Sequence, residues 1–128
     1  MSPLSTAIRR EVRERAEERC EYCLLPENVA FHPHQIDHIV PKQHGGSDDL
    51  ANLALACVFC NRMKGPNLAT LDPDTGELVA FFNPRSSTWT EHFRLEEEHI
   101  VGQTPKGRAT VRIFRFNDDV RIKQRRAL

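Results

Sequence analysis

The segment "QIDHIVPKQHGGSDDLANLALACVFCNRMKGP", residues 35–66, holds two apolar runs separated by a polar loop with a Gly-Gly pair. The first run predicts a strand over about 35–40, which Pro41 ends, and the second predicts a return strand near 53–56. A short helix is expected from about Phe59 to Gly65, because a glycine followed by a proline commonly ends a helix. The segment therefore predicts a β-hairpin followed by a helix.

All four cysteines of the chain lie in two C-x-x-C pairs, Cys20 with Cys23 and Cys57 with Cys60. Each pair brings two thiolates to one side of a tight turn, and two such turns complete the tetrahedral sulfur shell that suits Zn²⁺. The 33 residues between the pairs exceed the spacing of simple zinc ribbons, so an inserted element is expected there. A redox role is disfavoured, since a thioredoxin-like site needs a single pair. We predict a structural zinc site.

The composition fits a soluble globular domain, with 39% hydrophobic and 28% charged residues in a chain of 128. The first twenty residues lack the apolar core of a signal peptide, and no apolar run is long enough for a membrane span. We therefore expect a cytoplasmic protein with reduced cysteines and no membrane partner.

The net charge is zero, but the charges are unevenly distributed along the chain. Residues 67–99 hold seven acidic and two basic side chains, whereas residues 103–128 hold eight basic and two acidic ones. The basic run can meet phosphate, or it can be a solvated helix face.

Periodicity predicts further elements on both sides of the hairpin. A helix capped by Ser5 or Thr6 is expected to run to about Arg19. Short strands are expected after the turn in "LDPDTGELVAFF" and in "STWTEHFRL" and "EEEHIVG". Residues 105–116 fit a helix that starts at Thr104-Pro105, but they also alternate as a strand does. A last basic helix is expected from Asp118 to about residue 126.

The order of "IDHIVP", a Gly-Gly loop, "NLALAC" and "CNRMKG" resembles the HNH endonuclease family, and the likeness covers residues 20–66. Later elements such as "LDPDTGELVAFFNPR" resemble the C-terminal extension of a common subgroup. The resemblance implies an α+β fold: a ββα-metal finger framed by a four-cysteine zinc site, with an N-terminal helix and an extension of short strands and helices. We expect residues 1–66 to form the helix and the nuclease core, and residues 67–128 to pack on that core.

The resemblance also assigns catalytic residues. His38 matches the histidine that acts as general base on a water, and Asp37 matches the carboxylate that binds a divalent ion. Asn61 matches the last residue of the motif, a ligand of Mg²⁺ or Mn²⁺, although an asparagine after a cysteine turn can also cap a helix. Asn52 matches the asparagine that orients the loop carrying the base. Since neighbours on a flat strand face opposite ways, a twist or bulge is expected at Asp37 and His38.

Basic and aromatic residues outside the motif have weaker assignments. Arg62 and Lys64 are candidates for a phosphate contact, and His44 in the Gly-Gly loop is a candidate for phosphate or metal. The aromatic residues of the extension are expected to be core rather than a platform for stacking bases: Phe81, Phe82, Trp89 and Phe93.

These observations predict an endonuclease that hydrolyses double-stranded DNA with one structural Zn²⁺ and one catalytic Mg²⁺ or Mn²⁺. The alternative is a zinc-stabilised nucleic-acid-binding module that does not cut. A zinc-ribbon-like protein-interaction domain is a third hypothesis, and it predicts no salt-dependent binding to DNA.

Overall fold

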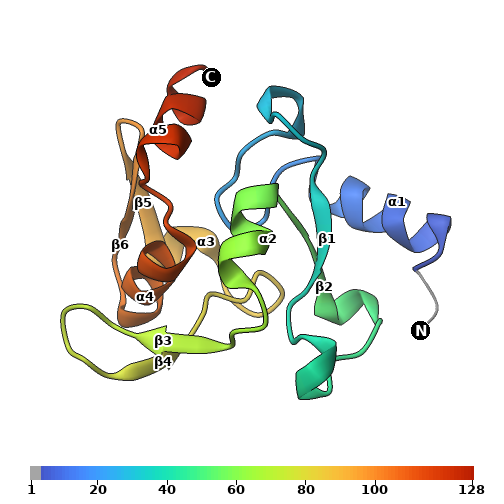
Figure 1. Cartoon of the computed structure of the whole chain (residues 1–128), viewed down its shortest axis with the longest axis horizontal. Helices are drawn as coiled ribbons and strands as arrows, with labels where there is room; N and C mark the ends of the chain where they lie inside the picture. The colour runs from blue at the N-terminus through green and yellow to red at the C-terminus, as the bar shows by residue number, and fades with distance from the viewer. Residues whose placement is uncertain (1–3) are drawn as a thin grey trace.

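A computed structural model describes residues 4–128 (Figure 1). Short 3₁₀ helices occupy Glu27–Val29, Lys42–His44 and Leu50–Asn52. None of the helices in the described part of the chain is both long and apolar enough to cross a membrane. The helices and strands follow one another in this order: α1 (Thr6–Arg15), β1 (Gln35–His38), β2 (Leu53–Ala56), α2 (Val58–Lys64), β3 (Ala69–Leu71), β4 (Leu78–Ala80), α3 (Trp89–His92), β5 (Phe93–Glu96), β6 (His99–Gly102), α4 (Pro105–Phe114) and α5 (Asp119–Arg126).

Helix α1 begins as predicted but ends earlier. The Ser5 hydroxyl accepts a hydrogen bond from the Ile8 amide at 3.1 Å, which satisfies one of the free N–H groups of the first turn. The helix ends at Arg15 rather than near residue 19, because Glu17 and Glu18 have φ angles of 54° and 57°. This left-handed backbone turns the chain out of the helix and into the first cysteine pair.

Strands β1 and β2 form an antiparallel hairpin, as the sequence predicted. All four residues of β2 are buried, because the hairpin lies between α1 and α2 (Figure 1). On the α1 side, Val12 packs against Leu53 and Leu55. The register is continuous from Gln35, opposite Ala56, to His38, opposite Leu53. The expected bulge at Asp37 and His38 is therefore wrong, and the two side chains leave opposite faces of a regular strand.

Helix α2 begins at Val58, with the Cys57 sulfur accepting a bond from the Cys60 amide at 3.4 Å. It ends at Lys64, where Gly65 takes a φ of 50°. Cys57 is thus the cap of this helix, and Asn61 lies inside it. The capping role considered for Asn61 is wrong.

The C-terminal half contains two more hairpins and three helices. The predicted strands are present at β4, β5 and β6, but Trp89–His92 forms one turn of helix where a strand was expected. Residues 105–114 are helical, since the Thr104 hydroxyl accepts a bond from the Gly107 amide at 3.0 Å and Pro105 occupies the first turn. The basic helix α5 has the predicted bounds within a residue.

An aromatic cluster joins the C-terminal half to the first cysteine pair. Tyr22 and Phe114 have ring centroids 5.1 Å apart, and the Trp89 indole donates a hydrogen bond to the Tyr22 carbonyl at 2.9 Å. Each fully buried aromatic side chain stabilises the fold by about 1.5–3 kcal/mol. As predicted, the aromatic residues of the extension belong to the core: Phe81, Phe82 and Phe93 are buried, and Trp89 packs on them.

Candidate functional site

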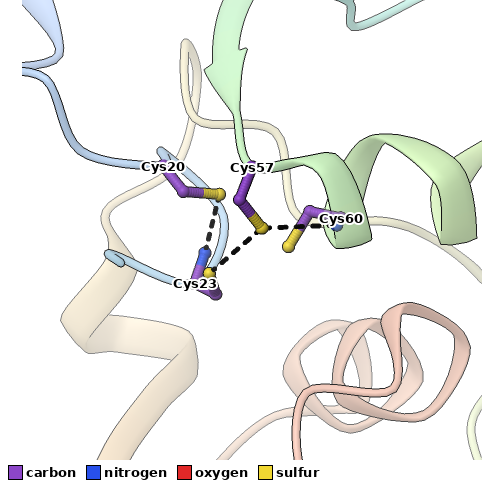
Figure 2. A group of neighbouring side chains, drawn as sticks. All are labelled: Cys20, Cys23, Cys57 and Cys60. Atoms are coloured by element: carbon purple, nitrogen blue, oxygen red, sulfur yellow. Dashed lines mark hydrogen bonds between the residues drawn. The ribbon is translucent and has the colours of Figure 1, made fainter. Parts of the chain in front are cut away.

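The four cysteines meet in the interior of the protein (Figure 2). All are free and buried, and their sulfur atoms lie within 4.8 Å of one another. The sulfurs of Cys23 and Cys57 are 3.7 Å apart. A tetrahedral Zn²⁺ with bonds of about 2.3 Å places its sulfurs about 3.8 Å apart, so the cluster has the dimensions of a zinc site. The residues present fit a structural zinc ion.

Tight turns aim the thiols at this common point. The Cys23 amide donates to the Cys20 sulfur at 3.5 Å, and the Cys60 amide donates to the Cys57 sulfur in the same way. One pair lies in the segment after α1 and the other at the start of α2, so the hairpin β1–β2 leads from one pair to the other. A metal bound here would join the segment that precedes β1 to the start of α2.

Asp37 lies on the face of β1 that is turned toward α2. Its side chain is 6% exposed; Oδ2 accepts a hydrogen bond from the Tyr22 hydroxyl at 2.6 Å, and Oδ1 accepts one from the Lys64 ammonium at 3.2 Å. Burial raises the pKa of Asp37, and the Lys64 charge and the Tyr22 bond oppose this shift. Burial and the Asp37 charge together raise the pKa of Tyr22 well above its usual value.

Lys64 has an internal role. It is 3% exposed and donates to the His38 carbonyl at 3.0 Å as well as to Asp37. The structure thus places it away from the surface where a phosphate contact was predicted. Arg62, by contrast, is exposed, and so is His44, whose Nε2 lies 3.0 Å from the Pro66 carbonyl.

His38 leaves the other face of β1, and Asp48 holds its ring. The distance from His38 Nε2 to Asp48 Oδ1 is 2.8 Å, and the Lys42 ammonium lies 2.8 Å from the second oxygen, Oδ2. These two bonds lower the pKa of Asp48. Because a carboxylate only accepts hydrogen bonds, Nε2 carries the proton, and the lone pair of neutral His38 is on Nδ1.

Asn52 ties the loop after β1 to the start of β2. Its Oδ1 accepts from the Val40 amide at 2.8 Å, while its Nδ2 donates to the carbonyls of Val40 and Ser47. We call these three side-chain hydrogen bonds of Asn52 the Asn52 clamp. Gly46 lies so close to it that a Cβ there would overlap the Val40 carbonyl oxygen. The loop that follows His38 is therefore fixed by side-chain bonds and by a glycine that no larger residue replaces without movement.

Asn61 projects from α2 toward the strand. Its Nδ2 donates to Gln35 Oε1 at 2.6 Å, and among residues 4–128 its Oδ1 has no hydrogen-bond partner. A shallow hollow of about 280 Å³ is lined by Asp37, His38 and Asn61 together with Ile36, Pro41, Lys42, Gly65 and Pro66. Three of the four predicted catalytic residues thus line one hollow. Asn52 does not line it but binds the loop that follows His38.

The donors in this hollow suit a hard divalent ion. Mg²⁺ binds one or two protein oxygens and keeps several waters for exchange with substrate phosphate. The hollow is lined by the carboxylate of Asp37, whose two oxygens accept bonds from Tyr22 and Lys64, and by the amide of Asn61. No group of three or more His, Cys, Asp or Glu ligands other than the four cysteines occurs in the described part of the chain.

Comparison with known proteins relates this region of the chain to one protein family. The sequence model of the HNH endonuclease family matches residues 20–67, from the first cysteine to just beyond α2. Residues 20–67 are therefore similar to the HNH endonuclease domain. No curated protein and no solved structure matched the chain. HNH domains bind nucleic acids and are usually nucleases.

Three residues that contact the cysteine cluster or the hollow were missed by the sequence analysis. Tyr22 lies inside the first cysteine pair, where its letter gives no sign of a bond to Asp37. Asp48 lies in the polar loop just after the Gly-Gly pair, and its contact with His38 spans ten positions of the sequence. Arg121 donates to the Cys60 sulfur from α5, outside the matched residues. Only Asp48 had a usable signal, namely a carboxylate in a loop that returns beside a histidine.

Proposed function

We propose that this protein is a metal-dependent endonuclease that hydrolyses phosphodiester bonds of double-stranded DNA, with His38 as the general base. The observation that carries the proposal is the hollow in the HNH domain, where His38, Asp37 and Asn61 meet. A general base, a carboxylate and an amide oxygen around one open site are the groups that phosphate-ester hydrolysis requires.

His38 supplies the base through Nδ1. Asp48 accepts the Nε2 proton, which fixes the tautomer and directs the free lone pair of Nδ1. When Nδ1 takes a proton from water, the Asp48 carboxylate stabilises the imidazolium. The ring is held by a carboxylate that Lys42 also binds, so its orientation is set before substrate arrives.

Asp37 and Asn61 are the residues that would hold the divalent ion. Such an ion supplies positive charge to the phosphate and to the departing oxygen. Tyr22 orients the Asp37 carboxylate. Burial raises the pKa of the Asp37 carboxyl, and the Lys64 ammonium beside it opposes that rise and so favours the ionised form.

Substrate phosphates meet the positive side chains around the hollow. Lys42 lines the hollow with its side chain 35% exposed, and the exposed Arg62 adjoins Asn61 on α2. Contacts of this kind with phosphate do not depend on the base sequence of the DNA, and they weaken as the salt concentration rises. The cytoplasm is the compartment we propose, since the zinc site needs reduced thiols.

A plasmid-nicking assay with Mg²⁺ or Mn²⁺ tests the proposal. The wild-type protein is expected to nick supercoiled plasmid, and His38→Ala is expected to lose about 10²–10⁴-fold in rate while keeping its zinc and its fold. His99→Ala, in an exposed residue of β6, is the matched control and should cut normally. Equal cutting by wild type and His38→Ala would overturn the assignment.

The Lys64–Asp37 ion pair favours a second candidate function, a nucleic-acid-binding HNH domain that does not cut. In this alternative Lys64 remains the permanent cation partner of Asp37. Binding of duplex DNA would then depend on salt but not on Mg²⁺, and no nicking would be seen at any metal concentration.

A further inference from the structure

Arg121 reaches the cysteine cluster from the C-terminal helix. It is 3% exposed, and its Nη2 lies 3.0 Å from the Cys60 sulfur and 3.6 Å from the Cys57 sulfur. In Figure 2 the faint red ribbon of the C-terminal segment is drawn below the four cysteines. The guanidinium thus contacts two of the four sulfurs from a residue 61 positions along the chain from Cys60.

The position of this guanidinium is fixed by its other contacts. Nη1 donates to the Phe114 carbonyl at 2.7 Å, so the fork is held from both sides. The central carbon lies 5.5 Å from the Phe59 ring centroid and 5.6 Å from that of Phe116. These distances suit cation–π contacts, which strengthen when both groups are desolvated. Arg121 is therefore held against the sulfurs with little freedom to move away.

The charge of a zinc site in this place explains why an arginine is needed. Zn²⁺ with four thiolates carries two net negative charges, and burying a net charge is costly unless it is paired and hydrogen-bonded. The backbone amides of Cys23 and Cys60 donate to sulfur but carry no charge. Among residues 4–128, Arg121 is the one charged side chain that donates a hydrogen bond to a cysteine sulfur.

We propose that Arg121 is part of the zinc centre, where it neutralises and hydrogen-bonds the thiolates and slows the loss of the ion. The proposal concerns zinc retention and holds whether or not the HNH domain cuts DNA. It extends the functional unit beyond the matched residues, since α5 lies outside residues 20–67. Partners of metal ligands typically change metal affinity by about 10–100-fold.

Arg125 provides a matched control in the same helix. It is also buried, but it donates to the carbonyls of Glu98 and Phe116 and to Asn117 Oδ1, and to no sulfur. Arg121→Met and Arg125→Met therefore each remove one buried guanidinium from α5, and only the first removes a bond to sulfur. Comparing them separates an effect on the zinc centre from a general effect on helix packing.

The experiment measures zinc affinity and release in the full chain with a chromogenic chelator. Arg121→Met is expected to weaken zinc binding about 10–100-fold, and Arg125→Met to change it much less. In Co²⁺-substituted protein, Arg121→Met should also shift the sulfur-to-cobalt charge-transfer band to lower energy, because a hydrogen bond withdraws electron density from sulfur. Arg125→Met should leave this band in place.

Equal zinc affinities and an unmoved cobalt band in Arg121→Met would overturn the proposal. If that variant fails to fold, Arg121→Lys and Arg125→Lys decide the matter. Both keep the charge, but an ammonium at position 121 lacks the planar fork that joins the sulfurs to the Phe114 carbonyl. A cobalt band that shifts in Arg121→Lys alone supports the proposal, and a band unchanged in both contradicts it.

Discussion

The hydroxyl of Tyr22 donates a 2.6 Å hydrogen bond to Oδ2 of Asp37, and this bond links the first cysteine pair to the strand of the candidate nuclease site. Tyr22 lies between Cys20 and Cys23, so its ring is placed by the turn that presents the two thiols. The ring packs on Phe114 of α4 on its other side. The orientation of the Asp37 carboxylate therefore depends on the zinc site and on the extension as well as on β1.

Tyr22→Phe removes this bond and keeps the ring. We expect the free energy of unfolding to fall by about 1–3 kcal/mol, because the buried Asp37 oxygen loses its donor. The zinc content should not change, whereas nicking should need more Mg²⁺ because the carboxylate is less well oriented. Urea unfolding, zinc analysis and a Mg²⁺ titration of nicking measure the three effects. An unaltered Mg²⁺ requirement would contradict the role given to Tyr22.

Asp48→Asn removes the carboxylate that holds His38. We expect nicking to slow by about tenfold to a hundredfold, because an amide neither fixes the tautomer as firmly nor stabilises the imidazolium. Initial rates on supercoiled plasmid measure the change. Asp49→Asn is the control, since the side chain of Asp49 is exposed and makes no bond to His38. Equal rates for the two variants would count against the His38–Asp48 pair.

Gly46→Ala places a methyl group against the Val40 carbonyl inside the Asn52 clamp. The loop must move, so we expect a loss of about 1–3 kcal/mol in stability together with slower nicking. In Gly45→Ala, by contrast, the new methyl group meets no atom within 4 Å, although the φ of 89° makes it costly by about 1–2 kcal/mol. Thermal unfolding should rank both variants below wild type, and nicking should fall more in Gly46→Ala; the reverse order would argue against the clamp.

Asp72→Asn tests the ion pair that joins the β3–β4 hairpin to α4. Two hydrogen bonds of 2.9 Å from Arg108 lower the pKa of Asp72 below its usual value. A carboxylate whose pKa is lower in the folded state stabilises the fold above the unfolded pKa of about 3.9, and this stability is lost as the pH falls through the folded pKa.

Wild type should therefore be more stable than Asp72→Asn above about pH 5, and the difference should shrink as the pH falls below about 4. Urea unfolding over a pH series measures the difference. Asp74→Asn is the control, because that side chain is 66% exposed and its ion pair with Arg108 is screened by solvent. A difference between wild type and Asp72→Asn that did not depend on pH would refute the ion-pair explanation.

The sequence predicted the elements whose signals are local. The hairpin, α2 and the cysteine cluster follow from residue spacing, and the starts of α1 and α4 follow from Ser5 and Thr104. The four residues of α3 are too few to show a helical period, so the sequence pattern there predicts a strand. The early end of α1 depends on left-handed glutamates, a conformation that glutamate does not favour by itself.

Local sequence patterns do not show which residues contact the residues of the candidate site. Alternation along β1 suggested a bulge, but a regular strand delivers Asp37 to α2 and His38 to the following loop, and both still border the same hollow. The bond from Arg121 to Cys60 joins residues 61 positions apart in the sequence, and no pattern of spacing encodes such a contact. This contact is seen only in the folded structure, where α5 is packed beside the cysteine cluster.

The order of the cysteine pairs along the chain has a consequence for folding. An ion bound to both pairs cross-links Cys23 to Cys57 and closes a loop that contains β1, the clamped segment and β2. Closing such a loop lowers the conformational entropy of the unfolded chain, as a disulfide does. For loops of tens of residues this raises the free energy of unfolding by about 3–5 kcal/mol. The ion would thus reduce the number of conformations from which the hairpin segment must find its register.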